Sequence, residues 1–162
     1  MNAPTPQIAV TVHAFAQRLS STRRGARLAR LLAVEQLRTW QVSPAVTERV
    51  EQIVAELAAN AALHGHVQGR DFQLALTLDA ATGTVRVSVT DARGEQLPIT
   101  GADFEPSAHS ESGRGLCLVT TLADRWGTEP YPPSGKTVWA EIEGHGGRPE
   151  AVVSGQSGGR CR

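Results

Sequence analysis

VEQIVAELAANAALHGH, residues 50–66, is the segment that decides the fold. Glu56, Asn60 and His64 follow one another at steps of four, so on a helix they stack along one face. Apolar residues form the neighbouring stripe: Val46, Val50, Ile53, Val54, Leu57 and Ala61. This pattern predicts a helix that packs its apolar stripe on a core and presents a polar edge of carboxylate, carboxamide and imidazole. A solvated face is the simpler interpretation for an isolated helix, but motifs later in the chain argue against it.

Length and charge limit the classes of protein. The 162 residues are enough for one domain with a single core. Sixteen basic residues balance sixteen acidic ones, so there is no excess positive field to attract nucleic acid or a membrane surface. The chain shows no signal peptide and no apolar run near the roughly 20 residues that span a bilayer. We therefore expect a soluble cytoplasmic protein that binds neither nucleic acid nor membrane directly.

Helical signals dominate the first part of the chain. Leucines at helical spacing predict a helix over residues 22–40, capped by Ser20 or Ser21. The Ser-Pro pair at 43–44 is a helix start signal. It opens the decisive helix, which we place over residues 44–63 and expect to end at Gly65 and Gly69.

Strand signals dominate the second part, with one strand before the helices. Alternating apolar residues predict strands over residues 8–17, 72–79, 85–90 and 136–143. A short helix is expected over residues 115–125. Residues 123–127 lead into a further strand, and residues 130–135 are expected to form a turn rich in proline. Helices followed by strands, without a βαβ rhythm, imply an α+β sandwich.

Two kinds of segment fall outside these elements. Residues 96–112 have no periodicity, and a structureless loop of that length inside a small domain is usually functional or disordered. We expect a loose N-terminus over residues 1–11, one domain over residues 12–143 and a disordered Gly/Ser-rich tail over residues 144–162.

Two short motifs could carry chemistry. Asp91 ends a predicted strand just before Gly94. A carboxylate only accepts hydrogen bonds, so in a pocket it could select the amino group of adenine against the carbonyl group of guanine. Taken alone, Asp91 is better explained as a turn-forming residue, which is common. Gly113-Arg114-Gly115 precedes a predicted helix, where glycines and free N–H groups suit a phosphate.

Two other interpretations fail. Gly135-Lys136-Thr137 suggests a P-loop, but Pro130 stands where that motif needs glycine, and a strand follows instead of a helix. His64 and His66 have no further ligand at metal spacing, and neither do Cys117 and Cys161.

Taken in order, the motifs resemble the GHKL ATPase superfamily, which includes gyrase, histidine kinases and MutL. The segment from Glu56 to His64 resembles its N box, residues 91–94 its G1 box, and residues 113–116 its G2 box. The short segments 122–127 and 135–139 bring the chain nearest to the anti-sigma-factor serine/threonine kinase branch. The resemblance spans about residues 12–143, and although each motif is weak alone, four in register are specific.

The resemblance implies a Bergerat fold, a two-layer sandwich with helices on one face of a mixed, mainly antiparallel sheet. It implies ATP and Mg²⁺ as cofactors, with Glu56 as the catalytic base and Asn60 as the Mg²⁺ ligand. The nucleotide would be bound by a set of residues from all the motifs: Asn60, His64, Asp91, Gly94, Gly113, Arg114, Gly115, Leu116 and Thr137. Within that set Asp91 would read adenine, Gly94 would leave room for the base, and Thr137 would support the adenine end.

The first functional hypothesis is an ATP-dependent serine/threonine kinase that binds a sigma factor and phosphorylates an anti-sigma-factor antagonist of the STAS type. The alternative is an ATP-gated anti-sigma binding module with little or no phosphotransfer. A sensor histidine kinase would need a preceding helix with a phosphoacceptor His, and the roughly 20 residues before Thr22 do not supply one. A degenerate domain is disfavoured because Glu56, Asn60 and Asp91 are all present. Dimers are common among relatives, so a homodimer is a further expectation.

Overall fold

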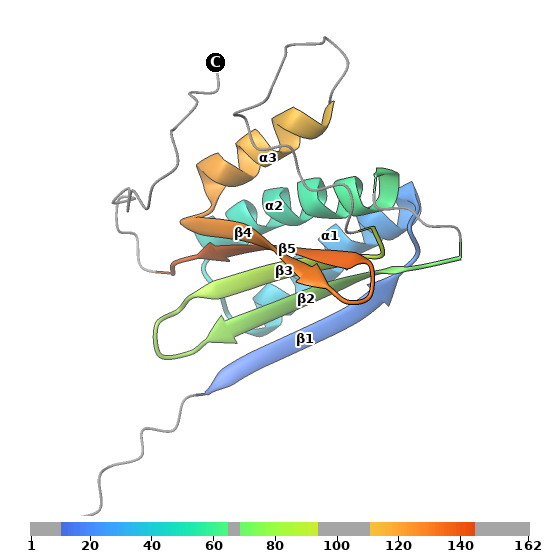
Figure 1. Cartoon of the computed structure of the whole chain (residues 1–162). Coiled ribbons are helices and arrows are strands. Elements are labelled where there is room, and N and C mark those ends of the chain that lie inside the picture. The colour runs from blue at the N-terminus through green and yellow to red at the C-terminus, as the bar shows by residue number, and fades with distance from the viewer. Residues whose placement is uncertain (1–10, 65–68, 94–110, 145–162) are drawn as a thin grey trace, which may run out of the picture.

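The protein is described by a computed structural model that covers residues 11–64, 69–93 and 111–144. Figure 1 shows two layers, with the helices on one face of a five-stranded sheet. The elements in chain order are β1 (Val12–Leu19), α1 (Arg23–Thr39), α2 (Pro44–Leu63), β2 (Phe72–Asp79), β3 (Val85–Asp91), α3 (Glu111–Leu122), β4 (Arg125–Tyr131) and β5 (Gly135–Ile142). The predicted α+β sandwich is confirmed.

The sheet has the strand order β1-β2-β3-β5-β4. Each of its four pairings is antiparallel, so within the described ranges the sheet is antiparallel throughout, where we expected a mixed one. Strands β2 and β3 form a hairpin, as do β4 and β5. Period-two alternation explains the layering, because every second residue of β2 and β3 is buried, and all of these are apolar except Asp91 at the end of β3.

The core lies between the sheet and the helices. Helix α2 rests on the centre of the sheet, between α1 and α3. Its apolar stripe is fully buried, as predicted, against the inward side chains of three strands. The largest side chains that are completely inaccessible to solvent are Phe72, Leu37, Ile53, Leu74, Leu76 and Ile142.

Two caps fix where α1 and α2 begin. Thr22, and not Ser20 or Ser21, caps α1, and its hydroxyl accepts from the Gly25 N–H at 3.0 Å. Gly25 lies so close to the Ser20 carbonyl oxygen that a Cβ would collide with it, which explains a glycine in the first turn. Ser43 caps α2 through the Val46 N–H, as the Ser-Pro pair predicted.

Some element bounds differ from the prediction. Strand β1 continues to Leu19 because each of its residues pairs with β2. Strand β4 runs through Pro130 to Tyr131, in a stretch that we expected to be a turn. A strand at the edge of a sheet tolerates proline, since its outward N–H needs no partner.

Several predictions concern residues outside the described ranges. These are the loose N-terminus at 1–10, Gly65, Gly94 with most of the predicted loop 96–112, and the tail at 145–162. Within the described ranges, no helix is both long and apolar enough to cross a membrane.

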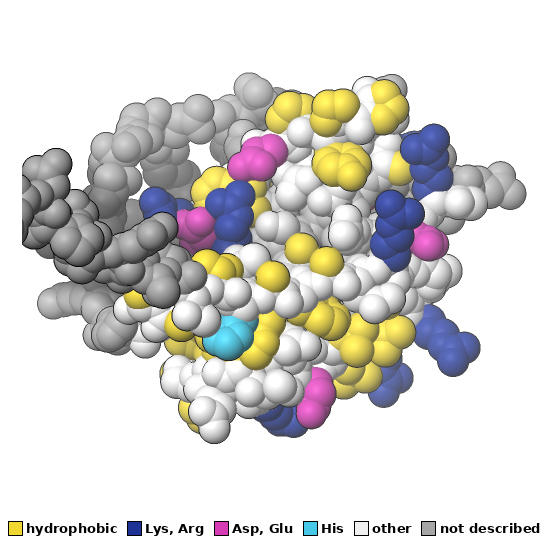
Figure 2. Space-filling view, turned by 90° about the horizontal axis from the view of Figure 1, so that it is seen from below, with side chains coloured by type: hydrophobic (Ala, Val, Ile, Leu, Met, Phe, Trp, Pro, Cys, Tyr) yellow, Lys and Arg dark blue, Asp and Glu magenta, His cyan; other side chains and the backbone are white. Residues whose placement is uncertain are grey.

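The face of the sheet opposite the helices carries no covering element among the described residues. Figure 2 shows the molecule from this side, with apolar and charged side chains intermixed. Arg86 lies at the centre of an ionic network on this face, with its guanidinium 4.2 Å from the ring centre of Trp139. It pairs with Glu141 at 3.0 Å and with Glu129 at 3.2 Å.

Candidate nucleotide-binding site

One flank of α2 carries the residues of the N-box-like segment. Arg49, near the start of the helix, donates from Nε to the Leu122 carbonyl at 2.8 Å and pairs with Asp124 at 3.1 Å. These contacts show that the flank of α2 that carries Arg49 faces the C-terminal end of α3. Glu56 lies seven residues after Arg49 and Asn60 eleven, close to two and three full turns. Both are therefore on the same flank, and both are half-buried.

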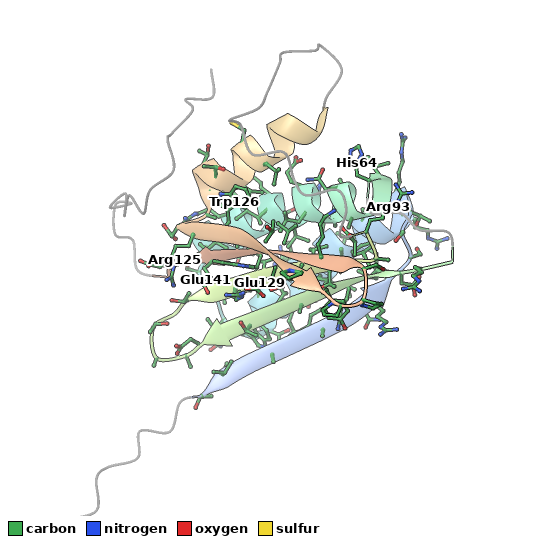
Figure 3. All side chains as sticks on the ribbon, viewed as in Figure 1. His64, Arg93, Arg125, Trp126, Glu129 and Glu141 are labelled. Atoms are coloured by element: carbon green, nitrogen blue, oxygen red, sulfur yellow. The ribbon has the colours of Figure 1, made fainter. Side chains whose placement is uncertain are left out.

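The segments that carry the other motifs meet this flank at one end of the molecule. Figure 1 shows that α3 runs antiparallel to α2, so its first turn lies at the end where α2 finishes. Figure 3 places His64, the C-cap of α2, and Arg93, just after β3, at that same end. Segments separated by up to about sixty residues in sequence are thus brought together by the topology.

Asp91 is the buried acidic residue at this end, with 6% of its side chain exposed. Its Oδ1 accepts from the Arg93 N–H at 2.9 Å, and its Oδ2 lies 3.4 Å from Nζ of Lys136. Burial raises the pKa of Asp91 above its ordinary value of 3.8, and the charge of Lys136 offsets part of this rise. The result is a carboxylate in a low-dielectric position, which suits an acceptor that selects between bases.

Lys136 stands where we expected Thr137. In the register of β3 and β5, Asp91 pairs with Lys136 and Thr90 pairs with Thr137. Directly paired residues share a face of the sheet, so Thr137 points to the opposite face, where its hydroxyl lies 2.7 Å from that of Thr90. The prediction that Thr137 supports the base beside Asp91 is therefore corrected.

The sequence contained a signal that could have found Lys136. Val138, Ala140 and Ile142 alternate on the buried face. Extending that alternation back by two residues places Lys136 on the same face, beneath the helices. The sequence pattern pointed to this lysine within a P-loop, and the observed strand β5 supports the rejection of that motif.

The G2-like residues lie inside α3 and not before it. The helix begins at Glu111, so Gly113, Arg114 and Gly115 occupy its first turns, although we expected it to begin at residue 115. Leu116, which was expected to contact the nucleotide, is 5% exposed and packs inward. Only its backbone could face a ligand.

His64 differs from its neighbours on the helix. It is exposed, and its backbone N–H donates to the Asn60 carbonyl at 2.8 Å as the helix ends. Glu56 and Asn60 instead lie in the body of α2, where the helix fixes their spacing.

Comparison with known families identifies the domain. Residues 19–142 match the model of the histidine kinase-like ATPase domain. The chain belongs to this family. Membership of an ATPase domain family implies that the protein binds ATP. No curated protein sequence matches the chain significantly.

Solved structures share the fold of this ATPase domain. One is described as the RsbU and RsbW domains of Rv1364c from Mycobacterium tuberculosis, with a TM-score of 0.60 and 21% identity over 86% of this chain. The chain spans only 32% of the length of that protein. A second is the SiaB-SiaC complex from Pseudomonas aeruginosa, with a TM-score of 0.57 and 14% identity, covering 79% of this chain and 88% of the other.

Proposed function

We propose that this ATPase domain is a serine/threonine protein kinase that regulates a sigma factor by phosphorylating an anti-sigma-factor antagonist. The observation that carries the proposal is the position of Glu56 and Asn60 on one flank in the second half of α2. This helix finishes at the end of the molecule where Figure 3 places His64 and Arg93. A carboxylate, a carboxamide and a helix N-terminus at one end of the domain suit a nucleoside triphosphate whose γ-phosphate is transferred.

Glu56 is the proposed general base. The hydroxyl oxygen of the substrate serine attacks the γ-phosphorus and its proton passes to the Glu56 carboxylate. The bond from the γ-phosphorus to the β,γ-bridging oxygen breaks, and ADP leaves. A positioned base typically contributes about 10²–10⁴-fold to the rate. Glu56 is half-buried and therefore not sealed off from solvent.

Asn60 is the proposed ligand of Mg²⁺, one turn beyond Glu56. Its carboxamide oxygen is a hard neutral donor of the kind that Mg²⁺ accepts, and Mg²⁺ commonly binds through few protein groups and keeps several waters. Bound Mg²⁺ would neutralise charge on the phosphates, as in other phosphoryl-transfer enzymes. Half-burial of Asn60 suits a group that must reach such an ion at the surface of α2.

The phosphates are proposed to lie at the first turn of α3. The first N–H groups of a helix have no partner within it, and the helix dipole favours negative charge there. Gly113 and Gly115 would allow close approach of the backbone, and Arg114 adds a positive charge. The adenine is proposed to bind at Asp91, on the neighbouring end of β3.

The partner proteins follow from the resemblance to anti-sigma-factor kinases. The antagonist supplies the serine or threonine, and the sigma factor is the protein held or released. One of the solved structures that share the fold is a complex named for two proteins, SiaB and SiaC, so a partner at this kind of domain has a structural precedent.

The test is transfer of labelled γ-phosphate from ATP to antagonist proteins captured from the cell extract. Glu48, an exposed acid near the start of α2 and more than two turns before Glu56, provides a matched control. We expect the wild type and Glu48→Gln to transfer phosphate, and Glu56→Gln to bind ATP normally but transfer at least about 100-fold more slowly. If the wild type binds ATP and labels no antagonist, the protein is an ATP-gated binding module instead.

A further inference from the structure

Lys136 is the only lysine of the chain, and it is buried. Its side chain is 8% exposed, on a face of β5 where the next inward residues are apolar. A buried charge is tolerated only when it is paired and hydrogen-bonded. Arginine outnumbers lysine fifteen to one among the basic residues, so a lysine at this one position calls for an explanation from its contacts.

Two contacts of Lys136 lead to the end of β3. Its Nζ donates to the Arg93 carbonyl at 2.9 Å and lies 3.4 Å from Oδ2 of Asp91. Arg93 in turn donates its N–H to Oδ1 of Asp91 at 2.9 Å. The backbone of one residue therefore fixes both the ammonium and the carboxylate, which stand side by side as a donor and an acceptor.

The two charges are close but not tightly bonded. A charge-assisted N–H···O bond usually measures about 2.7–2.9 Å, so 3.4 Å is long. A carboxylate has about four acceptor positions, and Arg93 and Lys136 face one oxygen each. Asp91 can therefore accept a further hydrogen bond without losing the one from Arg93, and the N–H of Lys136 that faces Asp91 can turn to another acceptor.

We propose that Lys136 is a specificity-determining residue that reads the N1 atom of adenine while Asp91 reads the N6 amino group. This rests on the proposed function, because it assigns a role within the nucleotide site. The Watson–Crick edge of adenine presents a donor, N6–H, beside an acceptor, N1. The Asp91 and Lys136 pair presents the complementary acceptor and donor.

The same pair rejects guanine and hypoxanthine. Those bases carry an acceptor, O6, beside a donor, N1–H, which is the reverse order. Arg93 fixes Asp91 through its N–H and Lys136 through its carbonyl, so the pair cannot exchange places. With guanine, Asp91 would face the acceptor O6 and Lys136 would face the donor N1–H. These are two mismatches, whereas Asp91 alone would provide one.

The test compares ATP with 1-deaza-ATP, in which a C–H group replaces N1 and the N6 amino group remains. Calorimetry gives the affinity of each nucleotide for the wild type and for Lys136→Met. A hydrogen bond to a charged group corresponds to a tenfold effect or more. We expect 1-deaza-ATP to bind the wild type about tenfold more weakly than ATP, and the two nucleotides to bind Lys136→Met equally.

Thr90→Val is the matched control, because it removes a hydroxyl next to Asp91 in sequence but on the opposite face of the sheet. It should keep the tenfold difference between the nucleotides. If Lys136 only supports Asp91, Lys136→Met will weaken both nucleotides by the same factor and the difference will persist, which overturns the inference.

Measurements on the wild-type protein alone also test the role of Lys136, whether or not Lys136→Met folds. Equal affinity of the wild type for ATP and 1-deaza-ATP overturns the role of Lys136 and leaves the proposed function intact. Failure of the wild type to bind either nucleotide overturns the proposed function, and the role of Lys136 with it.

Discussion

At the scale of single residues, the pair formed by Asp91 and Lys136 has the most consequences. Both side chains are nearly inaccessible to solvent, and each faces the opposite charge of the other. Burial raises the pKa of Asp91, and Lys136 lowers it again in part. Because the raised pKa means that the native state holds the proton more tightly than the unfolded state, ionisation of Asp91 costs stability as the pH rises from 3.8 through the native value.

The pKa of Asp91 can be measured from its side-chain carboxyl signal in a ¹³C NMR titration. We predict a midpoint above 3.8 in the wild type and a higher midpoint in Lys136→Met, because the variant loses the charge that favours the carboxylate. Affinity for ATP should fall on acidification through each midpoint, since a protonated acid is no longer a pure acceptor. A midpoint at or below 3.8, or one that Lys136→Met leaves unchanged, contradicts the described electrostatics.

Asp91 was predicted from the sequence, but its partner Lys136 was not. Asp91 was recognisable from the turn that follows it, whereas Lys136 belongs to a strand about 45 residues later. Which residue of β5 faces Asp91 depends on the register between the two strands, and a shift of one residue reverses the faces. The choice of Thr137 over Lys136 was an error of this kind.

At the scale of elements, Arg49 connects α2 with the end of α3 and the start of β4. It donates twice to the Leu122 carbonyl and pairs with Asp124. Asp124 also accepts from the Glu143 N–H at 2.7 Å, beyond the end of β5. One side chain on the flank of Glu56 thereby ties the start of α2 to the end of α3 and to the residue before β4, at the end of the domain away from the proposed site.

Arg49→Ala should lower the free energy of unfolding by about 1–3 kcal/mol, because it leaves a helix-end carbonyl and a half-buried carboxylate without their partner. Arg30→Ala is the control, since Arg30 pairs with Glu51 at an exposed position where such pairs contribute about 0–1 kcal/mol. Urea unfolding of both variants measures the difference. Equal destabilisation by the two variants would show that Arg49 is an ordinary surface residue.

Most elements were predictable because their signals are local. The Ser-Pro start of α2 and the alternation of β2 and β3 gave bounds that agree with the structure to within a residue. The first turn of α3 was missed, because the glycines at 113 and 115 argue against a helix on propensity alone. Proline likewise hid the extent of β4, whose pairing with β5 is a tertiary feature.

At the scale of the whole molecule, the two faces of the sheet have separate roles. The covered face holds the core and the Asp91 carboxylate. The open face holds the ionic network of Arg86, Glu129 and Glu141, which Arg125 joins through Glu141. Figure 3 shows Arg125, Glu129 and Glu141 near β4 and β5, well separated from His64 and Arg93.

Arg86→Ala should therefore change stability without changing nucleotide binding. The loss of two partly exposed ion pairs and of the stacking on Trp139 amounts to about 1–2 kcal/mol. Thermal unfolding measures the loss of stability. Calorimetry should find that Arg86→Ala binds ATP with the same affinity as the wild type. A clear drop in ATP affinity would mean that the open face communicates with the site through the sheet.

The central claim is that a nucleotide binds at one end of the domain, among the second half of α2, the end of β3 and the first turn of α3. Amide chemical shifts recorded during titration with ATP and Mg²⁺ test it most directly. The account predicts that the largest changes fall on residues 56–64, 91–93 and 111–116, with little change at Arg86 and Trp139. Saturable binding with its largest changes on the open face of the sheet, or no change at any of these three segments, would contradict it.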